Sequence, residues 1–98
     1  MDVYYILNGI TFVWNKEKAR QNPSKHNGIT FQQASEAFFD PFLKVVDASR
    51  NDEIRDAIIG LDTRWNLLFV VHIEFEDEVI RIISARKATR QERDYYEN

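Results

Sequence analysis

The chain of 98 residues contains no cysteine, only two prolines and three glycines, and no long apolar run. The lack of cysteine excludes disulfides, thiolate metal sites and cysteine nucleophiles, and we expect a cytoplasmic protein. No apolar stretch approaches the roughly 20 residues that cross a bilayer, and the first residues lack the basic and apolar pattern of a secretion signal. We therefore expect no membrane association.

Internal repeats, low-complexity stretches and Gly/Ser linkers are also absent. Apolar residues make up 44% of the chain and aromatic residues 13%, which suffices to offset the conformational entropy lost on folding. The chain is long enough for one hydrophobic core and too short for a second catalytic module. We expect a single domain over residues 1–98.

The net charge of −3 does not by itself favour nucleic-acid binding, which depends on clustered lysine and arginine. The charges are unevenly distributed, however. Residues 1–26 and 81–98 are each net positive, whereas residues 27–80 are net negative. If the fold joins the two ends, it creates a local positive site that attracts anions, and the acidic remainder suits a basic partner.

Hydrophobic periodicity and turn residues divide the chain into short elements. We expect strands over 3–7 and 10–14, helices over 16–21 and 31–39, strands over 42–46, 54–61, 67–75 and 79–84, and a helix over 90–96. The Asn8-Gly9 pair predicts a hairpin turn. Pro23 is expected to end the first helix near Asn22, because the residue before a proline avoids helical geometry. Thr30 can cap the second helix.

These elements predict an α+β fold with a mostly antiparallel sheet of about four strands, two N-terminal helices and one C-terminal helix. The spacing over residues 54–61 would also suit a helix. Alternation along residues 67–75 predicts which side chains face the core. The predicted core face is Leu67, Phe69, Val71, Ile73 and Phe75. The other face, with Leu68, Val70, His72 and Glu74, would then lie away from the core.

Lys25 and His26, with Lys18 and Arg20 upstream, form the first candidate site for chemistry on a phosphate. Histidine titrates near neutral pH and can accept or donate a proton, while lysines place positive charge beside a reacting phosphoryl group. The alternative is an ordinary surface loop that happens to contain one histidine.

A second cluster of basic residues follows the last predicted strand. Its members are Arg81, Arg86, Lys87, Arg90 and Arg93. Guanidinium groups match phosphate oxygens bidentately. Thr89 and Glu92 predict a capping box, so this cluster would lie at a helix N-terminus, where free amides also attract anions. The alternative is a solvated helix face, above all for Arg90 and Arg93.

The two histidines, His26 and His72, are far apart in the sequence, and no spacing of carboxylates predicts a metal site. Most aromatic side chains suit a core. Trp65 lies in a polar predicted turn, and Tyr95 and Tyr96 lie near the basic C-terminal segment. We expect one of these tyrosines to pack against the fold and the other to be free for a nucleotide.

Three stretches of the chain resemble the BrnT family of bacterial type II toxin-antitoxin ribonucleases. They are Phe12-Val13-Trp14-Asn15 with Lys18 and Asn22; Lys25-His26 with Gly28, Phe31 and Ala34, leading to Asp40-Pro41; and residues 81–88 with Glu92 and Tyr95. Two positions depart from the family pattern. Asn15 replaces the usual acidic residue, and Asn27 is an additional residue before Gly28.

The resemblance implies a RelE-like fold and endoribonuclease activity on RNA without a cofactor or metal. It also implies a cognate BrnA-like antitoxin that neutralises the toxin and binds operator DNA on its behalf. The matched positions imply catalytic roles for Lys25, His26, Arg81 and Arg86. They imply substrate contacts for Lys18, Lys87, Glu92 and Tyr95.

Within this hypothesis, the RNA 2′-hydroxyl attacks the adjacent phosphate. His26 or Lys25 would handle the proton, while Arg81 and Arg86 would stabilise the phosphate. The competing hypothesis is a non-catalytic, toxin-like module that only binds an antitoxin or regulatory partner. Direct DNA binding is less favoured, because no helix-turn-helix or ribbon motif is evident and the net charge is negative.

Overall fold

The computed structural model describes residues 1–98. The elements are β1 (Asp2–Leu7), β2 (Ile10–Asn15), α1 (Lys16–Lys25), α2 (Phe31–Glu36), the 3-10 turn η1 (Ala37–Phe39), β3 (Lys44–Asp47), β4 (Asp56–Leu61), β5 (Leu67–Phe75), β6 (Val79–Lys87) and α3 (Arg90–Glu97). The strands form one sheet in the order β1-β2-β6-β5-β4-β3. Only the pair β2 and β6 is parallel. The α+β class is confirmed.

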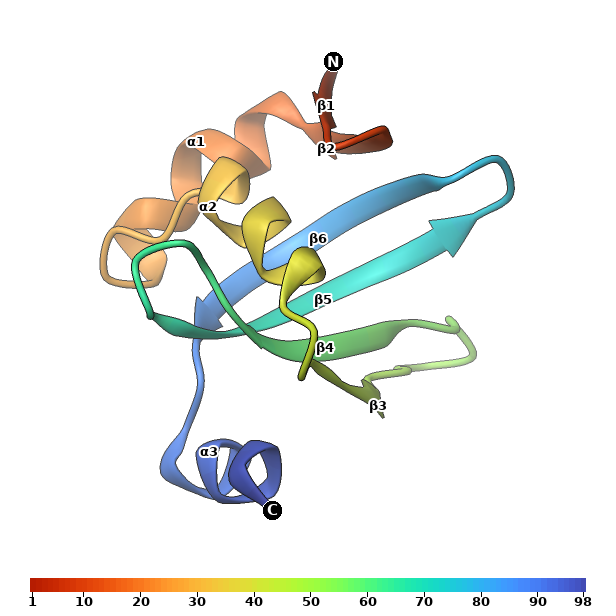
Figure 1. Cartoon of the computed structure of the whole chain (residues 1–98). Helices are drawn as coiled ribbons and strands as arrows, with labels where there is room; N and C mark the ends of the chain where they lie inside the picture. Colours follow the sequence, from red (N-terminus) through yellow and green to blue (C-terminus); the bar gives the residue numbers. More distant parts are fainter.

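The predicted sheet of about four strands is too small, because the N-terminal hairpin joins it and the sheet has six strands. Asn8 and Gly9 have φ angles of 50° and 82°, as the predicted two-residue turn between β1 and β2 requires. β2 then pairs with the first half of β6. The two net-positive ends of the chain therefore lie next to each other, with α1 beside β6 (Figure 1).

Helix α1 runs through Pro23 to Lys25, so its predicted end near Asn22 is wrong. The buried side chain of Asn22 explains the difference. Its Nδ2 donates to the carbonyl oxygens of Ile29, at 2.8 Å, and Ala85, at 2.9 Å, and its Oδ1 accepts from the Ala85 amide at 3.3 Å. These tertiary bonds hold the residue before the proline in helical geometry, against its local preference.

The hydrophobic core lies between the sheet and the helices α1 and α2, which cover one face of it (Figure 1). Trp14 from β2 packs against Phe31 of α2, with ring centroids 5.8 Å apart, and against Tyr5 of β1 at 5.6 Å. Helix α2 begins at the predicted cap Thr30, which forms a reciprocal capping box with Gln33. The predicted helix over 31–39 is present, and its last turn is the tighter η1.

The predicted core face of β5 is wrong, apart from Leu67, which is buried. Leu68, Val70 and His72 face the helices and are 0%, 0% and 5% exposed. The Nδ1 atom of His72 lies 3.1 Å from the Val70 carbonyl oxygen, and its ring meets Phe38 edge-on at 4.8 Å. Both faces of this central strand carry large apolar residues, so alternation could not identify the side that α2 covers.

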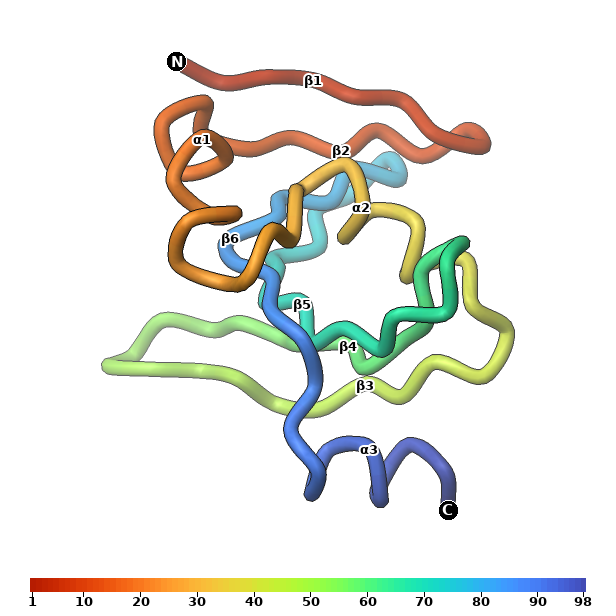
Figure 2. The backbone as a smooth tube through the Cα atoms, turned by 90° about the vertical axis from the view of Figure 1, so that its left-hand side faces the viewer, coloured from red at the N-terminus to blue at the C-terminus, as the bar shows by residue number.

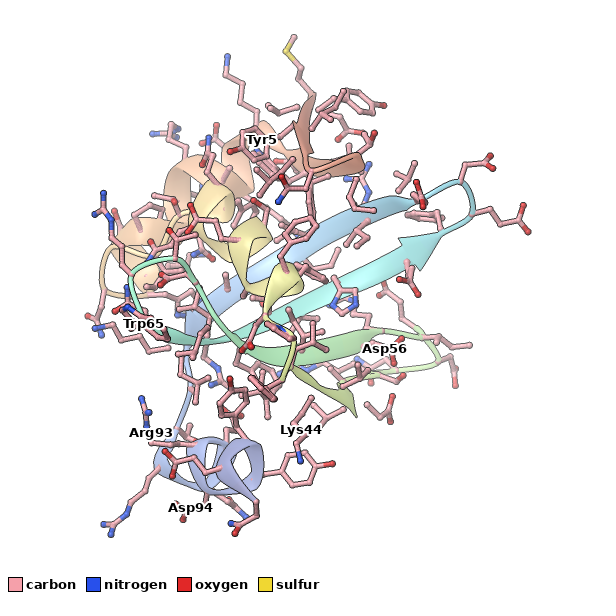
Figure 3. All side chains as sticks on the ribbon, in the orientation of Figure 1. Tyr5, Lys44, Asp56, Trp65, Arg93 and Asp94 are labelled. Carbon is pink, nitrogen blue, oxygen red and sulfur yellow. The ribbon has the colours of Figure 1, made fainter.

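Helix α3 lies on the opposite side of the sheet from α1 and α2 (Figures 1 and 2). It begins at the predicted capping box of Thr89 and Glu92. Tyr96 packs down and donates to Asp40 Oδ2 at 2.6 Å, whereas Tyr95 is 53% exposed. Trp65 lies in the turn between β4 and β5 and is 81% exposed (Figure 3). No helix has the length and apolar composition of a membrane span.

Candidate functional site

Basic side chains from distant parts of the chain line two connected cavities, which we call the basic groove. The first cavity, of about 260 Å³, lies between α1, β6 and the hairpin that joins β3 to β4. It is lined by Lys18, Gln21, Asn22, Lys25, His26, Arg50, Arg55, Ile83 and Ser84. Figure 2 shows the β3–β4 hairpin projecting on the same side of the molecule as α1.

The second cavity, of about 380 Å³, continues the groove toward α3. It shares Arg50, Arg55 and Ser84 with the first and extends to Phe69 and Arg86. The combined volume falls within the range typical of ligand sites. The groove is therefore large enough for part of a polyanionic chain.

Helix α1 presents its groove residues through its periodicity. Lys18, Asn22 and Lys25 are spaced i, i+4 and i+7, so they share one face of the helix. Asn22 fixes that face against the edge of β6. Lys18 and Lys25 are thereby held on the rim, while the half-buried His26 caps the C-terminal end. The helix dipole also favours cations at this end, which gives Lys25 a structural role as well.

A tight turn places the two hairpin arginines. Asn51 and Asp52 have φ angles of 46° and 67°, and the backbones of Arg50 and Glu53 exchange two hydrogen bonds around them. The turn therefore reverses the chain between Arg50 and Arg55, so that both arginines border the groove.

Most of the groove cations are free to bind a ligand. Lys18, Lys25 and Arg50 form no ion pair. Arg55 contacts Glu53 through Nη2 at 2.9 Å, but its buried Nε has no hydrogen-bond partner. The buried Nε is out of reach of a ligand, but the rest of the Arg55 side chain is 21% exposed, so its charge can act on an anion in the groove. The groove thus has both charge and unused hydrogen-bonding capacity.

Arg86 is held more firmly than the other groove cations. Its guanidinium donates bidentately to Glu92 at 2.7 and 2.9 Å, and its Cζ lies 4.1 Å from the centroid of the Phe69 ring. Hydrogen bonding to Glu92 raises the pKa of Arg86 above its ordinary value. Glu92 therefore orients a permanent cation at the α3 end of the groove.

The groove brings together four of the predicted site residues, namely Lys18, Lys25, His26 and Arg86. It does not include Arg81, whose guanidinium donates to Asp2 at 2.6 Å and borders no cavity. Along β6, Arg81 and Arg86 are separated by about 16 Å of strand. A clamp formed by these two arginines on one phosphate does not match this geometry.

The remaining predicted site residues do not line the basic groove. Lys87 is exposed and follows Arg86 on β6, so alternation directs it to the other face of the sheet. Glu92 serves the capping box and the pair with Arg86. Tyr95 borders a neighbouring cavity beside α3.

Sequence reasoning missed Arg50, Arg55 and Ser84 as groove residues. Ser84 belongs to the stretch that carries the family resemblance, and that signal could have identified it. Arg50 lies between two predicted strands and Arg55 near the start of the second, both in a net-negative region, and no local pattern distinguishes them from solvated charges. Their position depends on the order of strands in the sheet, which places the β3–β4 hairpin opposite α1.

A small α+β domain with a groove lined by lysines, arginines and a histidine has the charge distribution typical of proteins that bind polyanions. A family model described as "Ribonuclease toxin, BrnT, of type II toxin-antitoxin system" matches residues 14–92. The chain therefore belongs to the BrnT family of ribonuclease toxins, and the resemblance seen in the sequence is confirmed. A comparison with curated proteins gives no match.

The matched segment contains every residue of the basic groove. Membership in a type II toxin-antitoxin family implies an RNA target and an antitoxin partner. No three His, Asp or Glu side chains are grouped as metal ligands would be. The metal independence of the reaction stays a prediction.

Proposed function

We propose that this toxin cleaves RNA in the basic groove, without a metal ion, by attack of a 2′-hydroxyl on the adjacent phosphate. The observation that carries the proposal is the convergence of unpaired cations and one half-buried histidine on a single cavity. Such a reaction needs a base, a cationic site for the developing charge and a proton donor. Side chains that border the groove supply all three.

In the proposed mechanism, His26 accepts the proton of the 2′-hydroxyl as its oxygen attacks phosphorus. The bond from phosphorus to the 5′-oxygen breaks, and Lys25 donates a proton to this leaving group. The products are a 2′,3′-cyclic phosphate and a 5′-hydroxyl end. Arg50 and Arg55 hold the phosphate oxygens and stabilise the charge that develops there.

The two arginines of β6 receive different roles in this proposal. Arg86 binds the phosphate next to the reacting one, because it lies in the second cavity of the groove. Arg81 serves the fold by tying β6 to Asp2 at the start of β1. Lys18 extends the positive rim for the RNA backbone.

We further propose that a BrnA-like antitoxin neutralises the toxin in the cytoplasm and that only the antitoxin contacts operator DNA. The net-negative middle of the chain suits a basic segment of such a partner. The competing proposal, a non-catalytic binding module, predicts the same partner but no cleavage.

The decisive experiment is incubation of the partner-free protein with total RNA in EDTA. The test variant is Arg50→Ala/Arg55→Ala, and the matched control is Arg64→Ala/Arg90→Ala, which removes two exposed charges outside the groove. Each hydrogen bond to a charged group contributes about 1.5–3 kcal/mol. The test variant should therefore cleave at least about 100-fold more slowly than the parent, and the control within about twofold of it.

Equal cleavage by the parent and the groove variant would place the active site elsewhere. If none of the three proteins cleaves free RNA, the binding module becomes the better proposal. A separate comparison of His26→Gln with the parent tests the assignment of the base. The variant should cleave RNA about 100-fold more slowly than the parent or slower, as expected when a general base is removed.

A further inference from the structure

A third cavity, of about 320 Å³, lies beside α3 and adjoins the basic groove. It is lined by Val46, Asp47, Ile59, Phe69, Gln91, Glu92 and Tyr95. Asp47 and Phe69 also line the second cavity of the groove, so the two spaces are neighbours. A ligand in the groove can therefore extend into this cavity without leaving the surface.

The third cavity differs chemically from the groove. Its walls include the aliphatic side chains of Val46 and Ile59 and the rings of Phe69 and Tyr95, and it contains no lysine or arginine. Tyr95 is 53% exposed, and the Lys44 ammonium lies 5.2 Å from the centroid of its ring. Figure 3 shows Lys44 pointing from the sheet toward α3. An aromatic and aliphatic wall suits a planar, weakly polar group.

Asp47 sets the sign of charge that this cavity accepts. Its Oδ1 accepts hydrogen bonds from the Ser49 hydroxyl, at 2.7 Å, and the Ser49 amide, at 3.2 Å, whereas Oδ2 forms none. These bonds lower the pKa of Asp47, so the carboxylate is charged at neutral pH. A carboxylate repels a phosphate but accepts a hydrogen bond from an amino or imino group. In the third cavity no lysine or arginine offsets this carboxylate, as the arginines do in the second cavity, so a base is favoured over a phosphate as the occupant.

We propose that the third cavity is a nucleobase subsite, in which a base of the bound RNA stacks on Tyr95 while its backbone lies in the basic groove. This inference rests on the proposed function. The free Oδ2 of Asp47 accepts from an N–H on the edge of the base. Bases in a duplex are stacked and paired, so only an unpaired base can enter the cavity. The substrate is therefore single-stranded RNA or an unpaired segment of a structured RNA.

The inference is tested by direct binding rather than by cleavage. Fluorescence anisotropy in EDTA would measure binding of a short 2′-O-methyl oligoribonucleotide, which lacks the attacking hydroxyl, to the parent and variants. Tyr95→Ala should weaken binding about fivefold or more, because stacking on an aromatic side chain typically contributes this much or more per base. Tyr95→Phe keeps the ring and should bind like the parent.

The matched control is Tyr4→Ala, because Tyr4 is 69% exposed on β1 and lines no cavity. It should leave binding unchanged. A duplex of the same sequence should bind the parent and Tyr95→Ala equally, since its bases cannot reach the cavity. Circular dichroism should show the same secondary structure in all variants, because both tyrosines are exposed.

The outcomes separate this inference from the proposed function. Suppose that Tyr95→Ala binds single-stranded RNA as well as the parent, while Arg50→Ala/Arg55→Ala binds it weakly. The proposed nucleobase subsite is then wrong, and the proposal that RNA binds in the basic groove still stands. If neither variant weakens binding, the proposed function fails as well. If Tyr95→Ala binds RNA normally but weakens binding of the antitoxin, the cavity belongs to a protein interface and the inference is overturned.

Discussion

The face of the sheet that α2 covers and the basic groove differ in how their side chains are satisfied. On the covered face, the rings of Phe12, Trp14 and Phe31 are at most 1% exposed and contact other aromatic side chains. In the groove, charged side chains remain partly exposed, and three of the cations form no ion pair. The covered face provides stability and the groove retains binding capacity. Substitutions in the two regions should therefore have separable effects.

The largest predicted effect is the loss of stability caused by a substitution on the covered face. Phe12→Ala removes a fully buried ring that lies 5.3 Å from Phe38 and 6.2 Å from Phe39, and should lower the free energy of unfolding by about 3–5 kcal/mol. Urea unfolding followed by circular dichroism would measure it. Phe42→Ala is the control, because Phe42 is 73% exposed, and it should cost less than about 0.5 kcal/mol. Similar losses in both variants would contradict this description of the core.

The geometry of the groove predicts different effects on RNA cleavage for Arg81 and Arg86, which belong to one basic cluster in the sequence. Arg86→Ala should lower the rate of RNA cleavage by about 10- to 100-fold, as expected for one lost bond to a charged group of about 1.5–3 kcal/mol. Arg81→Ala should leave the rate within about threefold of the parent, because Arg81 is paired with Asp2 outside the groove. Equal losses of cleavage rate in the two variants would instead support a clamp formed by both arginines on one phosphate.

Local interactions explain which parts of the fold the sequence predicted correctly. The turn at Asn8-Gly9, the cap at Thr30 and the capping box at Thr89 all depend on residues within a few positions of each other. The failures involve partners distant in sequence. Asn22 keeps α1 helical through bonds to Ala85, which no pattern within the helix reveals.

The residues of the candidate site show the same difference between local and distant interactions. Lys25 and His26 were found because they are adjacent in one basic stretch, and both border the groove. Arg50 and Arg55 were missed because only the strand order brings their hairpin opposite α1. Arg81 and Arg86 form one predicted cluster because they are close in sequence. Successive residues of a strand are about 3.3 Å apart, however, so β6 holds the two arginines about 16 Å from each other.

A buried carboxylate on the covered face predicts the response to acid. Asp62 is 5% exposed, and it accepts side-chain hydrogen bonds from Gln33 of α2, at 2.7 Å, and Asn66, at 2.9 Å. Burial raises the pKa of Asp62, but these bonds and those from the Asn66 and Arg64 amides outweigh it, so the pKa lies below its ordinary value. The charged form therefore stabilises the fold above the unfolded pKa of about 3.9.

This stabilisation should be lost as the pH falls from about 4 through the lower folded pKa of Asp62. Asp62→Asn should lower the free energy of unfolding by about 2 kcal/mol at pH 7, and the difference from the parent should shrink on acidification. Urea titrations across this pH range would measure both effects. Asp94→Asn, at an exposed position of α3, should have little effect on stability. A difference between Asp62→Asn and the parent that does not change with pH would contradict the assignment.

The smallest predicted effect concerns α3, which lines the third cavity beside the groove and is anchored to Asp40 by Tyr96. Tyr96→Phe removes the hydrogen bond to Asp40 and should cost about 1 kcal/mol of stability at neutral pH. Burial and the bond to Asp40 raise the pKa of Tyr96 to about 12. The protonated phenol is thus favoured in the folded state, so its contribution is complete below the unfolded pKa of about 10 and is lost between about pH 10 and 12.

Tyr96→Phe should therefore remove that part of the alkaline loss of stability, which urea titrations at high pH would detect. RNA cleavage at neutral pH should change by less than about twofold, because the bond between Arg86 and Glu92 holds the start of α3 independently of Tyr96. A large loss of cleavage in this variant would show that α3 couples the covered face to the groove. In that case the position of Arg86 in the groove would depend on the C-terminal anchor, and the separation of stability from binding would fail at this helix.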